Sequence, residues 1–420
     1  MLILARLRGL RPSGALLGAF GVLLAALAGA LLAVAAPGAV AQQSIPNGPW
    51  IQPEQEVRLD ALTSNEGLGK VLRQIEARSR GRVKIEVVGQ SAGGWPIYLA
   101  KLGEPTPGKQ GVLIEGQIHG NEPLGSEASV QLLQELALSG NKRVDQILDT
   151  TTIWFLPRLN MDGAAFEVDG QLVQRRQNTQ EWTPEEWGLA PSTPAPWYHL
   201  SPIVGVWPGG YDVNRDFSPD LDFRLGPGGE ALLPGRSDLP GFFVTPEARA
   251  SAAVYQRLQP DVFVDLHHRL SSTQSEHDNQ LTTLQILGEA TDGTPEFPLD
   301  PDVHARSLQL NAYVYDVLQR LGKSPFTGIT RYPDVDLPGT ALGSYNLLGS
   351  AIMLYELRSA GGVLGAQQSS LKSNGMLIRQ EITGLRAMLV GLASGEIWNV
   401  DPQHYYDILP AGPFIFNPRV

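Results

Sequence analysis

The sequence of 420 residues contains no cysteine, so disulfide bonds and thiolate chemistry are excluded and a large core must hold the fold. It also lacks an excess of basic residues, since 32 Lys and Arg against 43 Asp and Glu give a formal net charge of −11. No stripe of basic residues is present, which argues against a nucleic-acid partner. After residue 41, no run is apolar enough to cross a bilayer. These absences leave a large globular protein held together by its hydrophobic core.

Residues 1–41 have the pattern of an export signal. Three arginines among the first eleven residues precede an apolar stretch over residues 15–36, and Ala39-Val40-Ala41 offers a small-residue cleavage site. An uncleaved membrane anchor is the alternative, because the stretch is long enough to span a bilayer. The Ala and Gly content favours cleavage. We predict a periplasmic or secreted protein with no stable membrane association after the signal is removed.

Segments of helical and strand periodicity alternate from residue 64 onward. This alternation predicts an α/β fold with a mixed, largely parallel twisted sheet and helices on both faces. We expect one catalytic domain over 64–400, preceded by a lead-in segment at 42–63 and followed by a C-terminal tail at 401–420. The expected strands are 83–88, 97–102, 112–114, 152–156, 261–266 and 351–355, and the expected helices are 68–79, 124–139, 246–258, 303–321 and 371–393.

Residues 180–241 are rich in Trp, Pro and Gly and predict a loop-rich insertion rather than a separate domain. Loops of this length in a compact fold often shape a binding site. We interpret the aromatic side chains as loop packing rather than as a platform for sugars. Four of the eight tryptophans lie here: Trp182, Trp187, Trp197 and Trp207.

His119 and Glu122 stand three residues apart in a turn between an apolar strand at Val112-Leu113-Ile114 and an amphipathic helix that begins at Leu124. Such a turn lies at the carboxyl end of a sheet, where α/β proteins place their ligands. Zinc hydrolases commonly bind the metal through two His and one Glu and leave the fourth position to water. The turn therefore predicts two of three metal ligands.

A second apolar strand, beginning at Val262, leads into Asp265, His267 and His268. Asp265 and His267 are two residues apart, so they share one face of the strand. Because two separate strands lead to metal-binding side chains, we predict that His267 is the third ligand. His268 points the other way and is interpreted as a neighbour, although an exchange of the two histidines stays open.

A third apolar strand, Ala351–Tyr355, leads into Glu356. Acids rarely close such a run without a partner or a task, and a general base is needed beside the metal. A salt bridge from Glu356 to Arg358 is the alternative. Arg215 follows Asn214 in a loop and offers a planar fork of donors that holds carboxylates.

Together, these residues resemble the zinc carboxypeptidases of the funnelin type (peptidase family M14). The resemblance spans about residues 64–395, and its seven elements occur in the family's order. They are His119/Glu122, Asn160-Met161-Asp162-Gly163, Arg176-Gln177-Asn178, Asp212-Val213-Asn214-Arg215, His267, Tyr332 and Glu356-Leu357-Arg358.

The resemblance implies a metal centre. His119, Glu122 and His267 are expected to bind one Zn²⁺ per chain, and Asp212 to accept a hydrogen bond from the remote nitrogen of His119. Glu356 is expected to activate the attacking water and then to carry its proton to the leaving amine.

The resemblance also implies how a substrate is held. Arg176 is expected to stabilise the oxyanion, Asn214 and Arg215 to bind the free C-terminal carboxylate, and Tyr332 to close over it. Two alternatives stay open, because Arg175 is adjacent to Arg176 and Tyr345 is the rival of Tyr332.

The expected function is that of a zinc metallocarboxypeptidase acting on peptides with a free carboxylate. No acid or base lies around Ala341, which favours apolar or small C-terminal residues. An amidohydrolase acting on N-acyl amino acids or peptidoglycan stem peptides is the first alternative, and a non-catalytic binding protein is the second. The other histidines are interpreted as surface or capping residues: His199, His277, His304 and His404.

Overall fold

The computed structural model describes residues 62–199, 209–269, 272–275, 278–290, 295–323, 325–334, 336–358 and 371–414. The chain divides into two compact units, and everything described belongs to the second, which covers Ile45–Val420. The predicted signal at 1–41, most of the lead-in at 42–63, Trp207 and His277 lie outside the described residues. Over the described ranges, no helix is long and apolar enough to cross a membrane.

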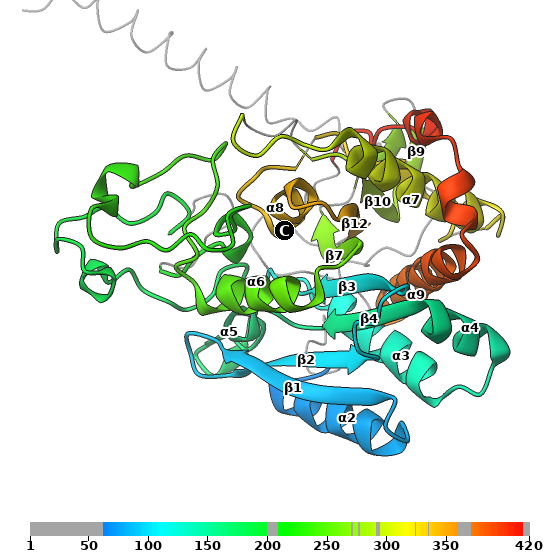
Figure 1. Ribbon diagram of the computed structural model, residues 1–420, viewed down its shortest axis with the longest axis horizontal. Coiled ribbons are helices and arrows are strands. Elements are labelled where there is room, and N and C mark those ends of the chain that lie inside the picture. The colour runs from blue at the N-terminus through cyan, green and yellow to red at the C-terminus, as the bar shows by residue number, and fades with distance from the viewer. Residues whose placement is uncertain are drawn as a thin grey trace, which may run out of the picture. The chain divides into compact units, whose positions relative to one another are not determined.

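An eight-stranded sheet forms the centre of the fold (Figure 1), in the order β1-β2-β4-β3-β7-β12-β10-β11. The central strands β4, β3, β7 and β12 are parallel, whereas β1 pairs antiparallel with β2, β2 with β4, and β12 with β10. The expected mixed, largely parallel sheet is confirmed. The strands are β1 (Val83–Gln90), β2 (Pro96–Leu102), β3 (Gln110–Gly116), β4 (Thr151–Leu156), β7 (Val262–Arg269), β10 (Leu284–Leu287), β11 (Ile329–Arg331) and β12 (Ala351–Arg358).

Helices cover both faces of the sheet. Ser251 in α6 donates to Glu115 in β3, and Glu115 is the register partner of Asp265 in β7. The next residue of β7, Leu266, points to the opposite face and contacts Gly125 in α3. The main helices are α2 (Asn65–Arg78), α3 (Leu124–Leu138), α4 (Lys142–Thr150), α6 (Pro246–Leu258), α7 (Pro301–Gln319), α8 (Ala341–Leu347) and α9 (Leu371–Ser394).

Burial explains why the central strands are apolar throughout rather than alternating. Residues 351–355 of β12 are all buried, as are 262–268 of β7, because helices pack on both sides of them. Both strands continue further than expected. His267 and Glu356 therefore lie within β7 and β12 rather than just beyond their ends. The prediction missed β10, β11, α4 and α8, because none of these segments is longer than nine residues, which is too short to show a clear hydrophobic period.

Residues 180–199 and 209–245 are mostly irregular and include the short 3-10 helices η3 (Pro184–Trp187), η4 (Val213–Arg215) and η5 (Gly229–Leu232). They have a hydrophobic cluster of their own, separate from the main core, which we call the loop core. Trp182, Trp187 and Trp197 pack against it, so these three tryptophans serve loop packing. The loop core comprises Leu189, Tyr198, Tyr211, Leu225, Leu233, Phe242 and Val244.

The expected tail beyond residue 400 packs onto the sheet. Residues 402–407 form the 3-10 helix η7 (Pro402–Asp407), in which Tyr405 is buried. Residues 409–414, which we call the C-terminal wall, then run between β11 and β8 (Thr273–Ser275). Arg331 exchanges backbone hydrogen bonds with the wall at 2.8 and 3.0 Å, and Thr273 does so at 2.9 and 3.1 Å.

Candidate metal and catalytic site

Two imidazoles and one carboxylate converge where the sheet meets α3. His119 Nδ1 lies 3.0 Å from Glu122 Oε1, His267 Nδ1 lies 2.9 Å from Glu122 Oε2, and the two Nδ1 atoms are 3.1 Å apart. All three residues are buried, and their ligand atoms lie within 4.8 Å of one another. The three residues predicted to bind the metal therefore come together from the turn before α3 and from β7.

The turn that carries His119 is held by a close approach of two backbone segments. A Cβ on Gly120 would lie 2.2 Å from the carbonyl carbon of Gly163, so only glycine fits there. Gly120 N donates to Arg176 O at 3.2 Å, and Asn160 Nδ2 donates to the same oxygen at 2.9 Å. The Asn160–Gly163 element thus positions both the metal turn and the segment that carries Arg176.

Each histidine presents its remote nitrogen to a carboxylate. His119 Nε2 lies 3.3 Å from Asp212 Oδ1, and His267 Nε2 lies 2.9 Å from Asp265 Oδ2. A ring hydrogen on Nε2 would face the carboxylate in each pair and leave Nδ1 for a metal. The sequence assigned Asp212 to such a contact. It gave Asp265 no role, although the two-residue spacing to His267 was the available signal. Two imidazole nitrogens, one carboxylate and supporting acids fit zinc.

The cluster is strongly charged despite its burial. Burial alone would raise the pKa of Glu122, but the two imidazoles hold that pKa well below its usual range. Burial alone would lower the pKa of His267, yet Asp265 and Glu122 raise it well above the ordinary value. Likewise Asp212 is buried, and Arg176 holds its pKa well below the usual range. Glu122 and Asp212 therefore stay ionised in the buried cluster, and a cation bound at His267 would replace the proton that the raised pKa of this ring retains.

Glu356 stands beside this cluster as the register partner of His267 on the neighbouring strand. Its Oε2 is shielded from solvent and has no hydrogen-bond partner among the described residues. Burial, together with the charge of Glu122, raises the pKa of Glu356 to about 7, and the opposing charges of His267 and Arg269 do not cancel this effect. A shielded oxygen without a partner is not what a structural salt bridge to Arg358 would give.

The adjacent arginines point to different places. Arg176 Nε donates to Asp212 Oδ2 at 2.9 Å, and its Nη1 lies 3.2 Å from His119 Nδ1 and 3.8 Å from Glu122 Oε1. Arg175 instead donates to the carbonyl of Gln177 at 3.3 Å and stacks on Phe166, 4.6 Å from the ring centroid. Only Arg176 of this pair reaches the metal cluster.

The Asn214-Arg215 pair lies in η4, next to the same cluster. Asn214 Oδ1 accepts a hydrogen bond from Ala341 N at 2.9 Å, and its Nδ2 lies 3.4 Å from His267 Nε2. Burial raises the pKa of Asp336, and the positive charge of Arg215 opposes this shift. The structure thus places Asn214 beside His267, and the charge of Arg215 acts on Asp212 and on the partly buried Asp336.

The two candidate tyrosines separate clearly. Burial and the charge of Glu356 raise the pKa of Tyr332, and the guanidinium of Arg269, two residues beyond His267 in β7, lies 3.8 Å from the Tyr332 ring centroid. Tyr345 lies in the main core, stacked on Tyr255 at 4.0 Å and bonded through its hydroxyl to Ser251 at 2.8 Å. Tyr332 is the tyrosine at the site, and Tyr345 supports β7 from within the core.

His268 faces α3, and the exchange left open with His267 is resolved by this geometry. Its backbone N–H donates to Glu122 Oε2 at 3.0 Å, and its ring Nε2 accepts from Leu124 N at 3.1 Å. His268 therefore helps to orient Glu122 at the start of the helix. The other described histidines lie away from the cluster; His404, for example, contacts Asp316 and Asp407 at 3.0 and 2.9 Å.

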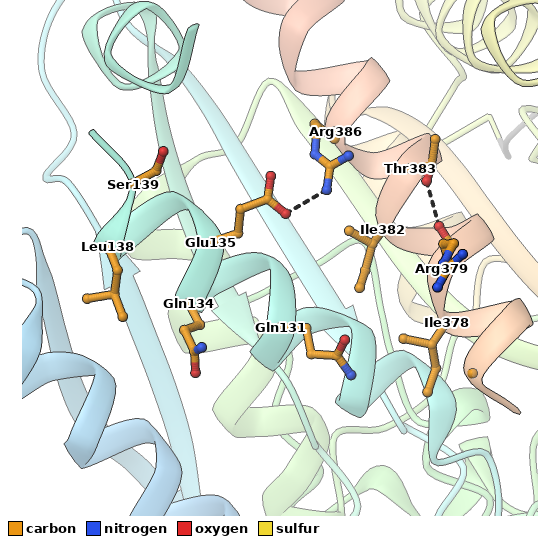
Figure 2. A pocket seen from close by; sticks show the side chains of 11 residues that line it. Gln131, Gln134, Glu135, Leu138, Ser139, Ile378, Arg379, Ile382, Thr383 and Arg386 are labelled. Carbon is orange, nitrogen blue, oxygen red and sulfur yellow. Dashed lines mark hydrogen bonds and ion pairs between the residues drawn. The ribbon is translucent and has the colours of Figure 1, made fainter. Parts of the chain in front are cut away.

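A groove with a volume of about 780 Å³ lies elsewhere, between α3 and α9 (Figure 2). An ion pair at 2.5 Å between Glu135 and Arg386 crosses it. Over the described ranges, the single group of three residues able to hold a metal is His119, Glu122 and His267, and none of these lines the groove.

The family model described as zinc carboxypeptidase matches residues 68–321. The chain belongs to the zinc carboxypeptidase family. The predicted family is therefore confirmed. The ion itself is not part of the structure.

Two curated relatives illustrate how far the similarity extends. The chain is 32% identical over 142 residues to carboxypeptidase E of Caenorhabditis elegans, covering 32% of this chain and 25% of that protein. It is 34% identical over 124 residues to carboxypeptidase Z of Mus musculus, covering 26% and 19%. The match thus spans a quarter or less of these relatives' own length.

Solved structures share the fold over a longer range. Bovine thrombin-activatable fibrinolysis inhibitor gives a TM-score of 0.54 at 16% identity, covering 82% of this chain and all of that chain. Carboxypeptidase A from Helicoverpa armigera gives 0.53 at 15% identity, covering 84% and 78%. At this level of identity the likeness concerns the fold.

Proposed function

We propose that this member of the zinc carboxypeptidase family is a zinc-dependent metallocarboxypeptidase that hydrolyses the C-terminal peptide bond of peptides. The observation that carries the proposal is the shielded, unpartnered oxygen of Glu356 beside the cluster of His119, Glu122 and His267. A binding protein on this fold has no need of a base held at a pKa of about 7. We also propose export, on the residue pattern of positions 1–41 alone.

In this proposal His119, Glu122 and His267 hold one zinc ion. Zinc, when bound, supplies Lewis-acid activation of the attacking water and of the scissile carbonyl. Asp212 and Asp265 hold the two imidazole rings in the tautomer that presents Nδ1 to the cation.

Glu356 is the proposed proton carrier. An ionised Glu356 accepts the proton of the attacking water and then delivers it to the nitrogen of the leaving amino acid. A pKa near the working pH suits both steps, because the group must accept a proton readily and also release it. The register of β12 against β7 keeps this carboxylate beside His267 throughout.

The remaining residues orient the substrate. Arg176 directs guanidinium donors toward the cluster and stabilises the negative charge that develops on the carbonyl oxygen. Asn214 and Arg215 hold the substrate's C-terminal carboxylate, for which the arginine fork is suited. Tyr332 closes the site next to Glu356.

The test uses purified protein and N-blocked dipeptides with either a free or an amidated C-terminus. We expect release of the C-terminal residue only from the free acid, and loss of turnover when the metal is chelated. Acyl amino acids and peptidoglycan stem peptides complete the series. Turnover that survives chelation, or that is equal on amidated peptides, would contradict the proposal.

Glu356→Gln is the decisive variant, because it removes the base and keeps the shape. We expect kcat to fall by about 10²- to 10⁴-fold with zinc content unchanged. The matched control is Glu135→Gln in the groove between α3 and α9, which should keep full activity because its ion pair with Arg386 is exposed. Equal activity of Glu356→Gln and wild type would refute the assigned role.

A further inference from the structure

We propose that a pocket beside the catalytic centre, built around Arg269, binds an acidic side chain of the substrate peptide, in addition to the C-terminal carboxylate held at Arg215. This inference rests on the proposed function and adds a substrate class to it, namely peptides with a second carboxylate. The pocket has a volume of about 280 Å³. It is lined by Arg269, Gln285, Pro333 and residues 411–414 of the C-terminal wall.

The pocket is continuous with the catalytic residues through the register of the sheet. His267 pairs with Glu356, and Glu356 pairs with Gln285, so these three side chains form a row on one face of β7, β12 and β10. Arg269 is two residues beyond His267 along β7 and thus points to the same face. A substrate bound at the metal cluster and Glu356 therefore lies next to Arg269, which is the following residue on the same face of β7.

Two polar atoms in this pocket are shielded and lack partners. Arg269 Nε and Gln285 Oε1 have no hydrogen-bond partner within the described part of the chain. Gln285 is 2% exposed, and its Nε2 donates to Ser272 Oγ at 3.0 Å, which fixes the amide. Shielded polar groups without partners are costly, so their occurrence as a pair in one cavity indicates a ligand that supplies an acceptor and a donor.

The positive charge of Arg269 is only weakly compensated. Within the described part of the chain its ion pair is with Asp334, at 3.7 Å, and that carboxylate is 71% exposed, so their attraction is small. The lining of the pocket therefore contains one cationic side chain and no acidic one. A carboxylate can form an ion pair with Arg269 and accept a hydrogen bond from its Nε, and a peptide N–H can donate to Gln285 Oε1.

The walls suit a side chain rather than a larger molecule. The Arg269 guanidinium lies 3.8 Å from the Tyr332 ring centroid and 4.9 Å from that of Phe414, so its plane is held between two aromatic rings. Stacking of this kind leaves the edge of the guanidinium to donate hydrogen bonds. Pro333 and Phe414 supply apolar surface for methylene groups. The volume is below that of pockets that enclose whole drug-sized ligands.

The experiment compares matched peptides that differ only in Glu against Gln, at the C-terminal residue and at the residue before it. We expect the wild type to prefer Glu at one of these positions by about ten- to hundredfold in kcat/KM, as for a hydrogen bond to a charged group. In Arg269→Gln the Glu to Gln ratio should fall to about one, and Arg269→Lys should retain part of it.

Ratios within one variant separate recognition from catalysis, because Arg269 also lowers the pKa of Glu356 and its loss changes both substrates alike. Arg386→Gln, in the groove between α3 and α9, is the matched control and should keep the wild-type ratio. Thermal unfolding checks that the variants are folded. A wild-type ratio near one, or a ratio unchanged in Arg269→Gln, overturns the proposal.

Failure of the proposed function gives a different result. If the protein hydrolyses no peptide in the series, the pocket is judged by calorimetry with the Glu and Gln peptides and zinc-loaded protein. Tighter binding of the Glu peptide that is lost in Arg269→Gln supports the pocket even then. Equal binding of the two peptides refutes it.

Discussion

The site is assembled from two regions that are built in different ways. The sheet contributes His267 and Glu356, whose places follow from the pairing of β7 with β12. The loops contribute Arg176, Asp212 and Asn214, which no regular element of more than a few residues supports.

A buried carboxylate, rather than the pairing of strands, holds the loops in position. Asp216 accepts hydrogen bonds from Tyr198 Oη, Val244 N and both the N–H and hydroxyl of Thr245, at 2.6 to 3.0 Å. Tyr198 and Val244 belong to the loop core, so one side chain ties that core to the chain next to Arg215. Backbone pairing therefore positions the site residues of the sheet, whereas side-chain hydrogen bonds position those of the loops.

Among the variants that compare the two regions, we expect the largest effect from Arg176→Ala, which tests whether the loops take part in the reaction. Arg176→Ala should lower kcat by about 10²- to 10³-fold, as does removal of an oxyanion donor in other hydrolases. Arg175→Ala should cost stability and leave kcat much less affected, because its guanidinium binds backbone carbonyls. Steady-state kinetics on one peptide measures both, and a larger kcat loss in Arg175→Ala would reverse the assignment.

A second prediction compares the two supporting acids, one from each region. Asp212→Asn and Asp265→Asn should each weaken zinc binding by about 10- to 100-fold, since each acid orients a ligand histidine. Competition with a chelator of known affinity measures the change. If only the Asp265 variant loses affinity, the loop carboxylate has no part in holding His119.

The dependence of kcat/KM on pH tests the role of Glu356, which the sheet contributes. Glu356 must be ionised to accept a proton, and its pKa is raised, so activity is lost as the pH falls through that raised value. Burial sets the pKa at about 7, while the charge of a bound cation lowers it. The acid limb of kcat/KM should therefore lie between the ordinary glutamate value of 4.5 and about 7. A limb below the ordinary value would exclude Glu356 as the base.

The smallest effect separates stability from function. Tyr198→Phe removes the donor to Asp216 and leaves Phe242 N without its partner, which should lower the free energy of unfolding by about 1–3 kcal/mol and raise KM. Tyr255→Phe, on the sheet side, removes the contact to Ser350 at a similar cost and should leave KM unchanged. Denaturant unfolding and kinetics on both variants provide the comparison.

The same contrast explains how much could be read from the sequence. His119, Glu122, His267 and Glu356 follow long apolar strands, and parallel strands bring their carboxyl ends to one edge. Their convergence was therefore predictable from periodicity. The larger part of the fold was predictable for the same reason, apart from strand lengths and the short elements β10 and β11.

Other features depend on contacts between distant segments. Arg175 and Arg176 are chemically identical neighbours, and only their contacts in the fold separate them, since Arg175 stacks on Phe166 and Arg176 donates to Asp212. Tyr332 and Tyr345 differ through the core that surrounds Tyr345. Arg269 received no role from the sequence, because most of the residues that complete its pocket, Pro333 and residues 411–414, lie more than sixty positions away.

The C-terminal wall has a consequence for how new preferences arise in this chain. Residues 409–414 bear on the Arg269 pocket without supplying a ligand, a base or a strand of the central sheet. Exchanging or recombining this short stretch would reshape what the neighbouring cavity accepts and leave the hydrolytic machinery intact. Diversification could thus proceed through a few residues outside the central sheet, without the packing constraints that act on the core.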